Sequence, residues 1–103
     1  MVNSESTDTL AELVSKAIGL GAEGLEIEYK DHHEEVTAMK GSMGIGIVAL
    51  RSDSKEAIAL RDELWKHRRK MKKLEVAGVN YKLKVSTFDS FGETAFRVEI
   101  RRA

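Results

Sequence analysis

The sequence predicts a two-layer α+β sandwich, in which two helices cover one face of a mainly antiparallel sheet of about five strands, in the order α-β-β-β-α-β-β. Two segments, about 8–19 and 52–75, place apolar residues at helical spacing. Five others are expected to be strands, three of which alternate between apolar and polar residues. Most linkers are too short for the crossovers that parallel strands need, so we expect hairpins.

The predicted helices each have one apolar stripe. The first stripe comprises Leu10, Leu13, Val14, Ala17 and Ile18. The second comprises Ala57, Leu60, Leu64, His67, Met71 and Leu74. Asp53 and Glu56 are expected to cap the start of this longer helix.

The strands alternate most clearly in "GLEIEYK" (24–30), which predicts an apolar face and a charged face. In "MGIGIVAL" (43–50), one face is expected to carry Met43, Ile45, Ile47 and Ala49. Gly44 and Gly46 would then lie on the opposite face and leave room for close packing.

The length and composition indicate one domain, at about 8–103, after a disordered polar tail at 1–7. Lysine plus arginine and aspartate plus glutamate balance at 17 each, so no net charge directs the chain to nucleic acid or membrane. The sequence has no cysteine, which excludes disulfides and zinc–thiolate sites. No apolar run approaches the roughly 20 residues of a membrane helix, and no signal peptide is evident. We therefore expect a cytoplasmic protein without membrane insertion.

Several short motifs have a structural and a chemical interpretation. Gly19, Gly21 and Gly24 match the letters of a dinucleotide-binding GxGxxG, but a helix precedes them and a strand follows, so a helix end is favoured. The run His32–Glu35 could supply metal ligands, although a solvated turn explains it better. Ser86 and Thr87 have no assignable histidine partner, and the chain lacks a P-loop. We expect no enzymatic activity, no cofactor and no metal site.

The strongest charge feature lies near the end of the second helix. It consists of Lys66, Arg68, Arg69, Lys70, Lys72 and Lys73. Such a basic patch could bind phosphates or an acidic partner. Alternatively, it is a solvated helix end, where cations are favourable beside the helix dipole.

Two stretches together resemble the N-terminal domain of type II secretion and type IV pilus assembly ATPases. "AIGLGAEGLEIEYK" (17–30) stands where that family has a helix running into a "GASDIHIEP" strand. "YKLKVSTFDSFGETAFRVEI" (81–100) stands where it has a "VRVSTLPT…GEKVVLRI" hairpin. The resemblance covers most of residues 9–101 and implies a PAS-like domain, an antiparallel sheet with helices against it. The ATPase domain itself is absent from this chain.

The resemblance also implies two candidate nucleotide- or phosphate-binding residues, Lys84 and Arg97. Family arginines near these positions reach nucleotide bound by the ATPase domain. Lys84 keeps the charge but lacks the bidentate guanidinium, and Arg97 comes one residue sooner after the Gly-Glu pair. The arginines of the family's second strand are missing, since Thr37, Ala38 and Met39 occupy that region.

Three functional hypotheses follow. The first is a non-catalytic interaction or regulatory module, whose protein partner would be a secretion or pilus motor component. The second is nucleic-acid or phosphate-ligand binding through the basic end of the second helix. The third is a PAS-like sensor of a small ligand, with Gly44 and Gly46 lining a cavity.

Overall fold

A computed structural model describes residues 9–103; the expected tail at 1–7 and the expected first residue of the first helix lie outside this range. The elements follow in the order α1 (Thr9–Gly19), β1 (Gly24–Lys30), β2 (His33–Lys40), β3 (Met43–Arg51), α2 (Lys55–Arg69), β4 (Lys72–Val76), β5 (Val79–Ser90) and β6 (Glu93–Arg102).

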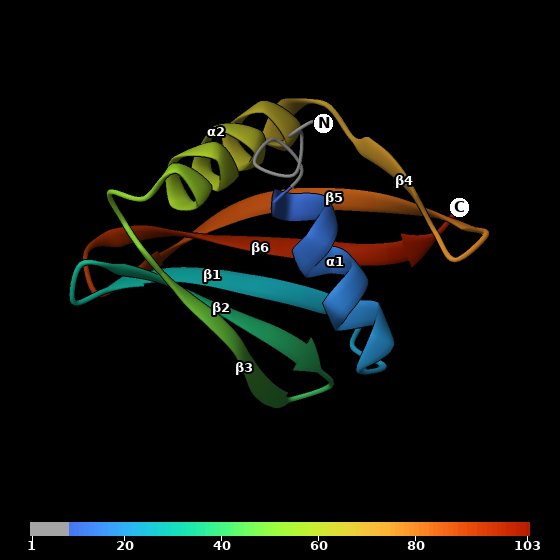
Figure 1. The fold of residues 1–103 in the computed structure, drawn as a ribbon, viewed down its shortest axis with the longest axis horizontal. Coiled ribbons are helices and arrows are strands. Elements are labelled where there is room, and N and C mark those ends of the chain that lie inside the picture. Colours follow the sequence, from blue (N-terminus) through green and yellow to red (C-terminus); the bar gives the residue numbers. More distant parts are fainter. Residues whose placement is uncertain (1–8) are drawn as a thin grey trace.

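The strands form one six-stranded sheet in the order β3-β2-β1-β6-β5-β4, and every neighbouring pair is antiparallel. Both helices lie on the same face of this sheet, with β3 and β4 at its opposite edges (Figure 1). The predicted α+β sandwich is therefore confirmed, with six strands instead of five. The uncovered side of the sheet is called the open face below.

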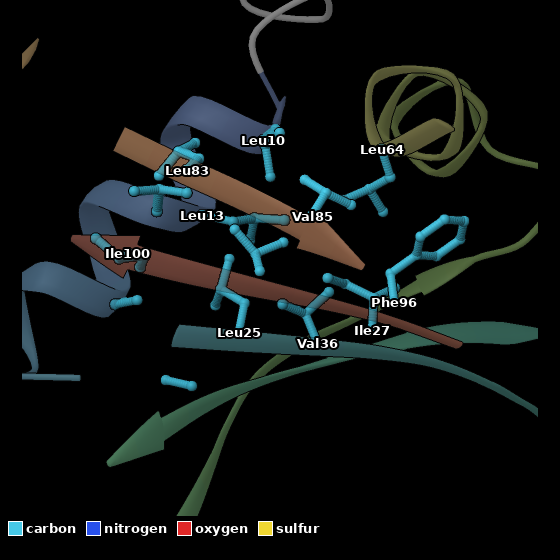
Figure 2. Packing of buried hydrophobic residues seen from close by; sticks show 14 of the residues in the cluster. Leu10, Leu13, Leu25, Ile27, Val36, Leu64, Leu83, Val85, Phe96 and Ile100 are labelled. Carbon is cyan, nitrogen blue, oxygen red and sulfur yellow. The ribbon is translucent and has the colours of Figure 1, made fainter. Parts of the chain in front are cut away.

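The hydrophobic core lies between the helices and the covered face of the sheet. Leu10 and Leu13 of α1 and Leu64 of α2 meet Leu25, Ile27 and Phe96 of the central strands (Figure 2). Leu10, Leu25 and Leu64 have no exposed surface, and burying a leucine contributes roughly 1.5–3 kcal/mol relative to exposure. The periodicity of both helices and of the central strands placed these residues correctly.

The sixth strand is a correction to the sequence prediction, which extended the second helix to residue 75. The helix ends at Arg69, and Lys70 already has an extended backbone, with φ −132° and ψ 119°. Residues 72–76 pair with β5 across the two-residue turn Ala77-Gly78. Leu74 fits the helical stripe, but it packs against the core from a strand, because period two also places it inward.

The start of α2 is a second correction. Ser54 is the N-cap residue, and its hydroxyl accepts a hydrogen bond of 3.1 Å from the backbone N–H of Ala57. Asp53, which the sequence predicted as the cap, instead accepts hydrogen bonds from the guanidinium of Arg51 at 3.2 and 3.3 Å.

A β-bulge in β3 is the third correction. The register pairs Val36 with Val48 and then Thr37 with Gly46, so Ile47 is an additional residue. The bulge moves Val48 to the covered face and Ala49, opposite Glu35, to the open face. The uninterrupted alternation predicted for 43–49 is therefore wrong beyond Ile47.

Tight turns join all four hairpins. Each has two residues between the paired strands: Asp31-His32, Gly41-Ser42, Ala77-Gly78 and Phe91-Gly92. In three of them both residues have positive φ, as in the turns that match strand twist. Phe91 adopts φ 52° while its side chain is fully exposed.

Candidate anion-binding site

The C-terminal end of α2 carries the cations Lys66, Arg68 and Arg69. Cations at this end are favourable because the last carbonyls of a helix carry partial negative charge. The imidazole Nδ1 of His67 lies 3.1 Å from the carbonyl oxygen of Lys70, so the ring binds the first residue beyond the helix. This contact joins the last turn of the helix to the residue that follows it.

A surface pocket of about 420 Å³ lies between this helix end and the sheet. Its walls are His67, Arg68, Arg69, Met71, Lys84, Val85 and Arg101. It brings together two sets of residues that the sequence suggested separately: two arginines of the basic patch and Lys84 of the candidate phosphate site. We call Arg68, Arg69, Lys84 and Arg101 the cationic pocket.

Most of these charges have no anionic partner in the part of the chain that the structure describes. Arg68 lies 5.8 Å from the centre of the Trp65 ring, and no ion pair involves Arg68, Arg69 or Lys84 within residues 9–103. Arg101 donates a hydrogen bond of 3.0 Å to Glu99. Arg68, Arg69 and Lys84 therefore share one hollow without an ion pair, although the strand register places Glu99, the partner of Arg101, opposite Lys84.

Arg97, the other candidate phosphate-binding residue, does not join the pocket. It shares the open face with Lys84, but its guanidinium donates hydrogen bonds of 2.9 and 3.1 Å to Glu26 on β1. The guanidinium carbon also lies 4.6 Å from the centre of the Phe88 ring. Arg97 therefore joins β6 to its neighbours on the open face.

A second group of cations adjoins the pocket. The strand register places Lys73 of β4 opposite Lys82 of β5, and Lys82 opposite Arg101 of β6. Like charges directly opposite each other in a sheet are destabilising. A bound anion would relieve this repulsion. Lys82 and Arg101 were not among the sequence candidates, although strand pairing derived from the apolar alternation could have suggested them.

The remaining basic residues behave differently. The ammonium of Lys72 lies 3.8 Å from Glu63, which also lies 3.7 Å from His67, so Lys72 has an anionic partner. Lys66 and Lys70 are exposed and do not line the pocket. The predicted patch of six cations therefore divides: Arg68 and Arg69 line the pocket, Lys73 belongs to the second group, Lys72 pairs with Glu63, and Lys66 and Lys70 are exposed to solvent.

The residues His32–Glu35 do not converge on one point. His32 lies in a turn, while the carboxylate of Glu34 is buried and accepts hydrogen bonds from Ser52 and Arg61. Glu35 lies on the open face. Within residues 9–103 no group of three or more His, Cys, Asp or Glu side chains could hold a metal ion.

A further hollow of about 390 Å³ adjoins the Glu34–Arg61 pair and is also lined by Trp65 and Tyr29. Two of its charged groups, Glu34 and Arg61, already bind each other, and Glu93 also lines the hollow. Arg61 donates to Glu34 at 2.9 Å and to the carbonyl oxygen of Ser52 at 3.1 Å. The arrangement fixes α2 to the sheet, which is a structural role.

Gly44 and Gly46 face away from the core. Their register partners are Met39 and Thr37, whereas Ile45 between them lies opposite the buried Ala38. A Cβ at Gly44 would lie 2.9 Å from the Thr37 side chain, and one at Gly46 would meet nothing within 4 Å. These glycines therefore do not line an interior ligand cavity.

No protein-family model matches the chain, and no curated protein sequence matches it either. None of the helices in residues 9–103 is both long and apolar enough to cross a membrane.

Proposed function

We propose that the protein is a non-catalytic cytoplasmic binding module whose cationic pocket holds the phosphate groups of a ligand. The supporting observation is that Arg68, Arg69 and Lys84 line one hollow and form no ion pair within residues 9–103. Guanidinium groups bind phosphate oxygens in pairs, and lysine contributes a compact charge. The two arginines and the lysine come from different elements, as expected when a ligand is gripped from two sides.

The groups around the pocket favour binding over catalysis. The imidazole of His67 is already engaged, since Nδ1 lies 3.1 Å from the Lys70 carbonyl oxygen and Nε2 lies 3.7 Å from Glu63. Ser86 lies opposite Arg97 on the open face, beside a pocket whose charged walls are cations. The cations of the pocket can neutralise a phosphate group. Catalysis by the Ser86 hydroxyl would additionally require a free base within hydrogen-bonding distance.

The row of Lys73, Lys82 and Arg101 favours a ligand with several phosphates, such as a nucleic-acid strand. This row continues from the pocket across β4, β5 and β6, because Arg101 belongs to both. Binding to such a surface is expected to weaken steeply with salt, since each contacted phosphate releases counterions.

The test is binding of a fluorescein-labelled single-stranded oligonucleotide at low salt, with inorganic pyrophosphate as competitor. The variant Arg68→Gln/Arg69→Gln should bind at least about tenfold more weakly and show a shallower salt dependence. The matched control Lys30→Gln/Lys55→Gln removes two charges outside the pocket and should bind as the parent does. The proposal would be contradicted if the parent bound neither the oligonucleotide nor pyrophosphate, or if both variants lost affinity for the oligonucleotide equally.

A second candidate function is docking on a secretion or pilus motor. It is favoured by the arrangement of the two stretches that resemble the motor family, because β1 pairs with β6 through Leu25–Val98 and its neighbours. Lys84 also stands where the family has a nucleotide-facing arginine. A pull-down with purified motor ATPase tests this function, and failure to retain the motor would argue against it.

A further inference from the structure

We propose that two copies of this chain associate through the outer edge of β3, which would join their sheets in an antiparallel pairing. β3 is one of two edges, since the strand order is β3-β2-β1-β6-β5-β4. The cationic pocket is lined by residues of α2, β5 and β6, and β5 lies next to the opposite edge strand β4, so this association is independent of the proposed phosphate site. Figure 1 shows β3 and β4 at opposite edges of the sheet.

The two edges differ in how well they are protected against pairing. β4 has five residues, three of them charged: Lys72, Lys73 and Glu75. β3 has nine residues and no charge between Met43 and Leu50. Short strands and lysines are the usual protection of an exposed sheet edge, and a long apolar edge favours pairing with another strand.

The apolar side chains of β3 are incompletely covered by the helices. Ile45, Ile47, Val48 and Leu50 pack against the core but remain only half-buried, in contrast to the fully buried Ala38 of β2. A second β3 beside the first would cover part of this exposed surface, and the hydrophobic effect would favour the pairing.

A second copy suits this edge because the strand is compatible with itself. An antiparallel β3–β3 pair places no like charges opposite each other between Met43 and Leu50. The charge at the end of the strand, Arg51, already has Asp53 as partner at 3.2 Å. The chain also has a formal net charge of zero, so no long-range repulsion opposes association. Such a two-fold pair is closed, because it uses the β3 edge of both copies, and the lysines of the β4 edge oppose further pairing there.

The bulge at Ile47 limits the strength of this association. Bulges bend a strand and shorten the continuous ladder that a partner can form. The interface is therefore expected to be small and the dimer weak, with a dissociation constant in the micromolar range.

Sedimentation velocity over about 5–500 µM tests the inference, because the dimer fraction must rise with concentration. Gly46→Lys/Ala49→Lys adds two positive charges to β3 at exposed positions of the open face, where self-pairing would bring the new lysines of both copies together. This variant is expected to stay monomeric throughout. The control Glu75→Lys changes the net charge equally at the opposite edge and should dimerise as the parent does.

Hydrogen exchange of the parent chain gives a second readout that needs no variant. Amides of β3 should become more protected at high concentration, while amides of β4 should not change. A parent chain that is monomeric over the whole range would overturn the inference. The inference would also be overturned if the Gly46→Lys/Ala49→Lys variant still dimerised, or if Glu75→Lys lost the dimer to the same extent as that variant.

Discussion

Arg61 of α2 and Glu34 of β2 form an ion pair with a nitrogen–oxygen distance of 2.9 Å, and the Glu34 side chain is only 7% exposed. The Ser52 hydroxyl donates a second hydrogen bond to the same carboxylate at 3.0 Å. Arg61 also donates to the Ser52 backbone carbonyl. The pair thereby joins the helix, the sheet and the segment between them.

Replacing Arg61 with methionine should destabilise the fold, because the buried Glu34 carboxylate would lose its cation while keeping most of its desolvation. We expect a loss of about 2 kcal/mol in the free energy of unfolding, measured by urea denaturation at pH 7. The control Arg101→Gln removes an exposed pair with Glu99 and should change stability by less than about 0.5 kcal/mol. Equal losses would show that Glu34 stays hydrated.

The burial of Glu34 could be predicted from the sequence, but its pairing with Arg61 could not. Strand alternation puts Glu34 on the same face as the buried Val36, so its burial is implicit in the sequence once the strand is known to start at His33. Its partner Arg61 is 27 residues away, and nothing in a local pattern joins them. The central strands and both helices were predictable because one period explains each of them.

The largest error, the missed strand β4, occurred where two patterns fit the same residues. Leu74 satisfies both helical and strand spacing, so the sequence did not separate β4 from α2. The cationic pocket could be predicted only in part. The sequence identified Arg68, Arg69 and Lys84, but only the three-dimensional arrangement places the helix end beside β5. The strand register also places Arg97 opposite Glu26, so Arg97 binds this carboxylate and does not join Lys84 in the pocket.

The carboxyl group of Asp53 should titrate at a lower pH than an ordinary aspartate. Hydrogen bonds from the Arg51 guanidinium, and then its charge, lower the pKa of Asp53. Arg51→Gln should raise that pKa toward its usual range in a carbon-detected NMR titration. Because the folded-state pKa is lowered, the stabilising effect exists above the unfolded pKa and is lost as the pH falls through the folded value.

Lys55→Gln is the control for this titration, since Lys55 forms no ion pair with Asp53 in the described structure. It should leave the pKa of Asp53 closer to the parent value than Arg51→Gln does. A pKa that is the same in the parent and in Arg51→Gln would show that the exposed pair does not persist in solution.

Phe91 should be replaceable by asparagine with a gain in stability. Its backbone is left-handed, with φ 52°, which is strained for a bulky residue. Its ring is fully exposed, so no side-chain packing offsets this strain. Phe91→Asn should raise the free energy of unfolding by about 0.5–1 kcal/mol, because Asn-Gly suits this turn. Thermal denaturation measures the change.

Ala77→Asn provides a comparison, since Ala77 also has φ 52°, in the equivalent Ala77-Gly78 turn. It should give a gain of similar size. A loss of stability in Phe91→Asn alone would show that the aromatic ring contacts the hairpin in solution.

Gly24→Ala should destabilise the sheet, because β1 and β6 approach too closely for a side chain there. An added Cβ would lie 2.7 Å from the backbone oxygen of Val98, and a backbone atom within a sheet cannot move aside as a flexible side chain could. We expect a loss of about 1–3 kcal/mol in the free energy of unfolding by urea denaturation.

The control is Gly46→Ala in β3, where a Cβ would meet nothing within 4 Å. This variant should be as stable as the parent or more stable by about 0.5 kcal/mol, because alanine restricts the unfolded chain. A large difference between the two variants would show that Gly24 is required by the close contact between strands, and not by the dinucleotide motif whose letters it completes. If both variants are equally stable, β1 and β6 can separate at Gly24 to admit a methyl group.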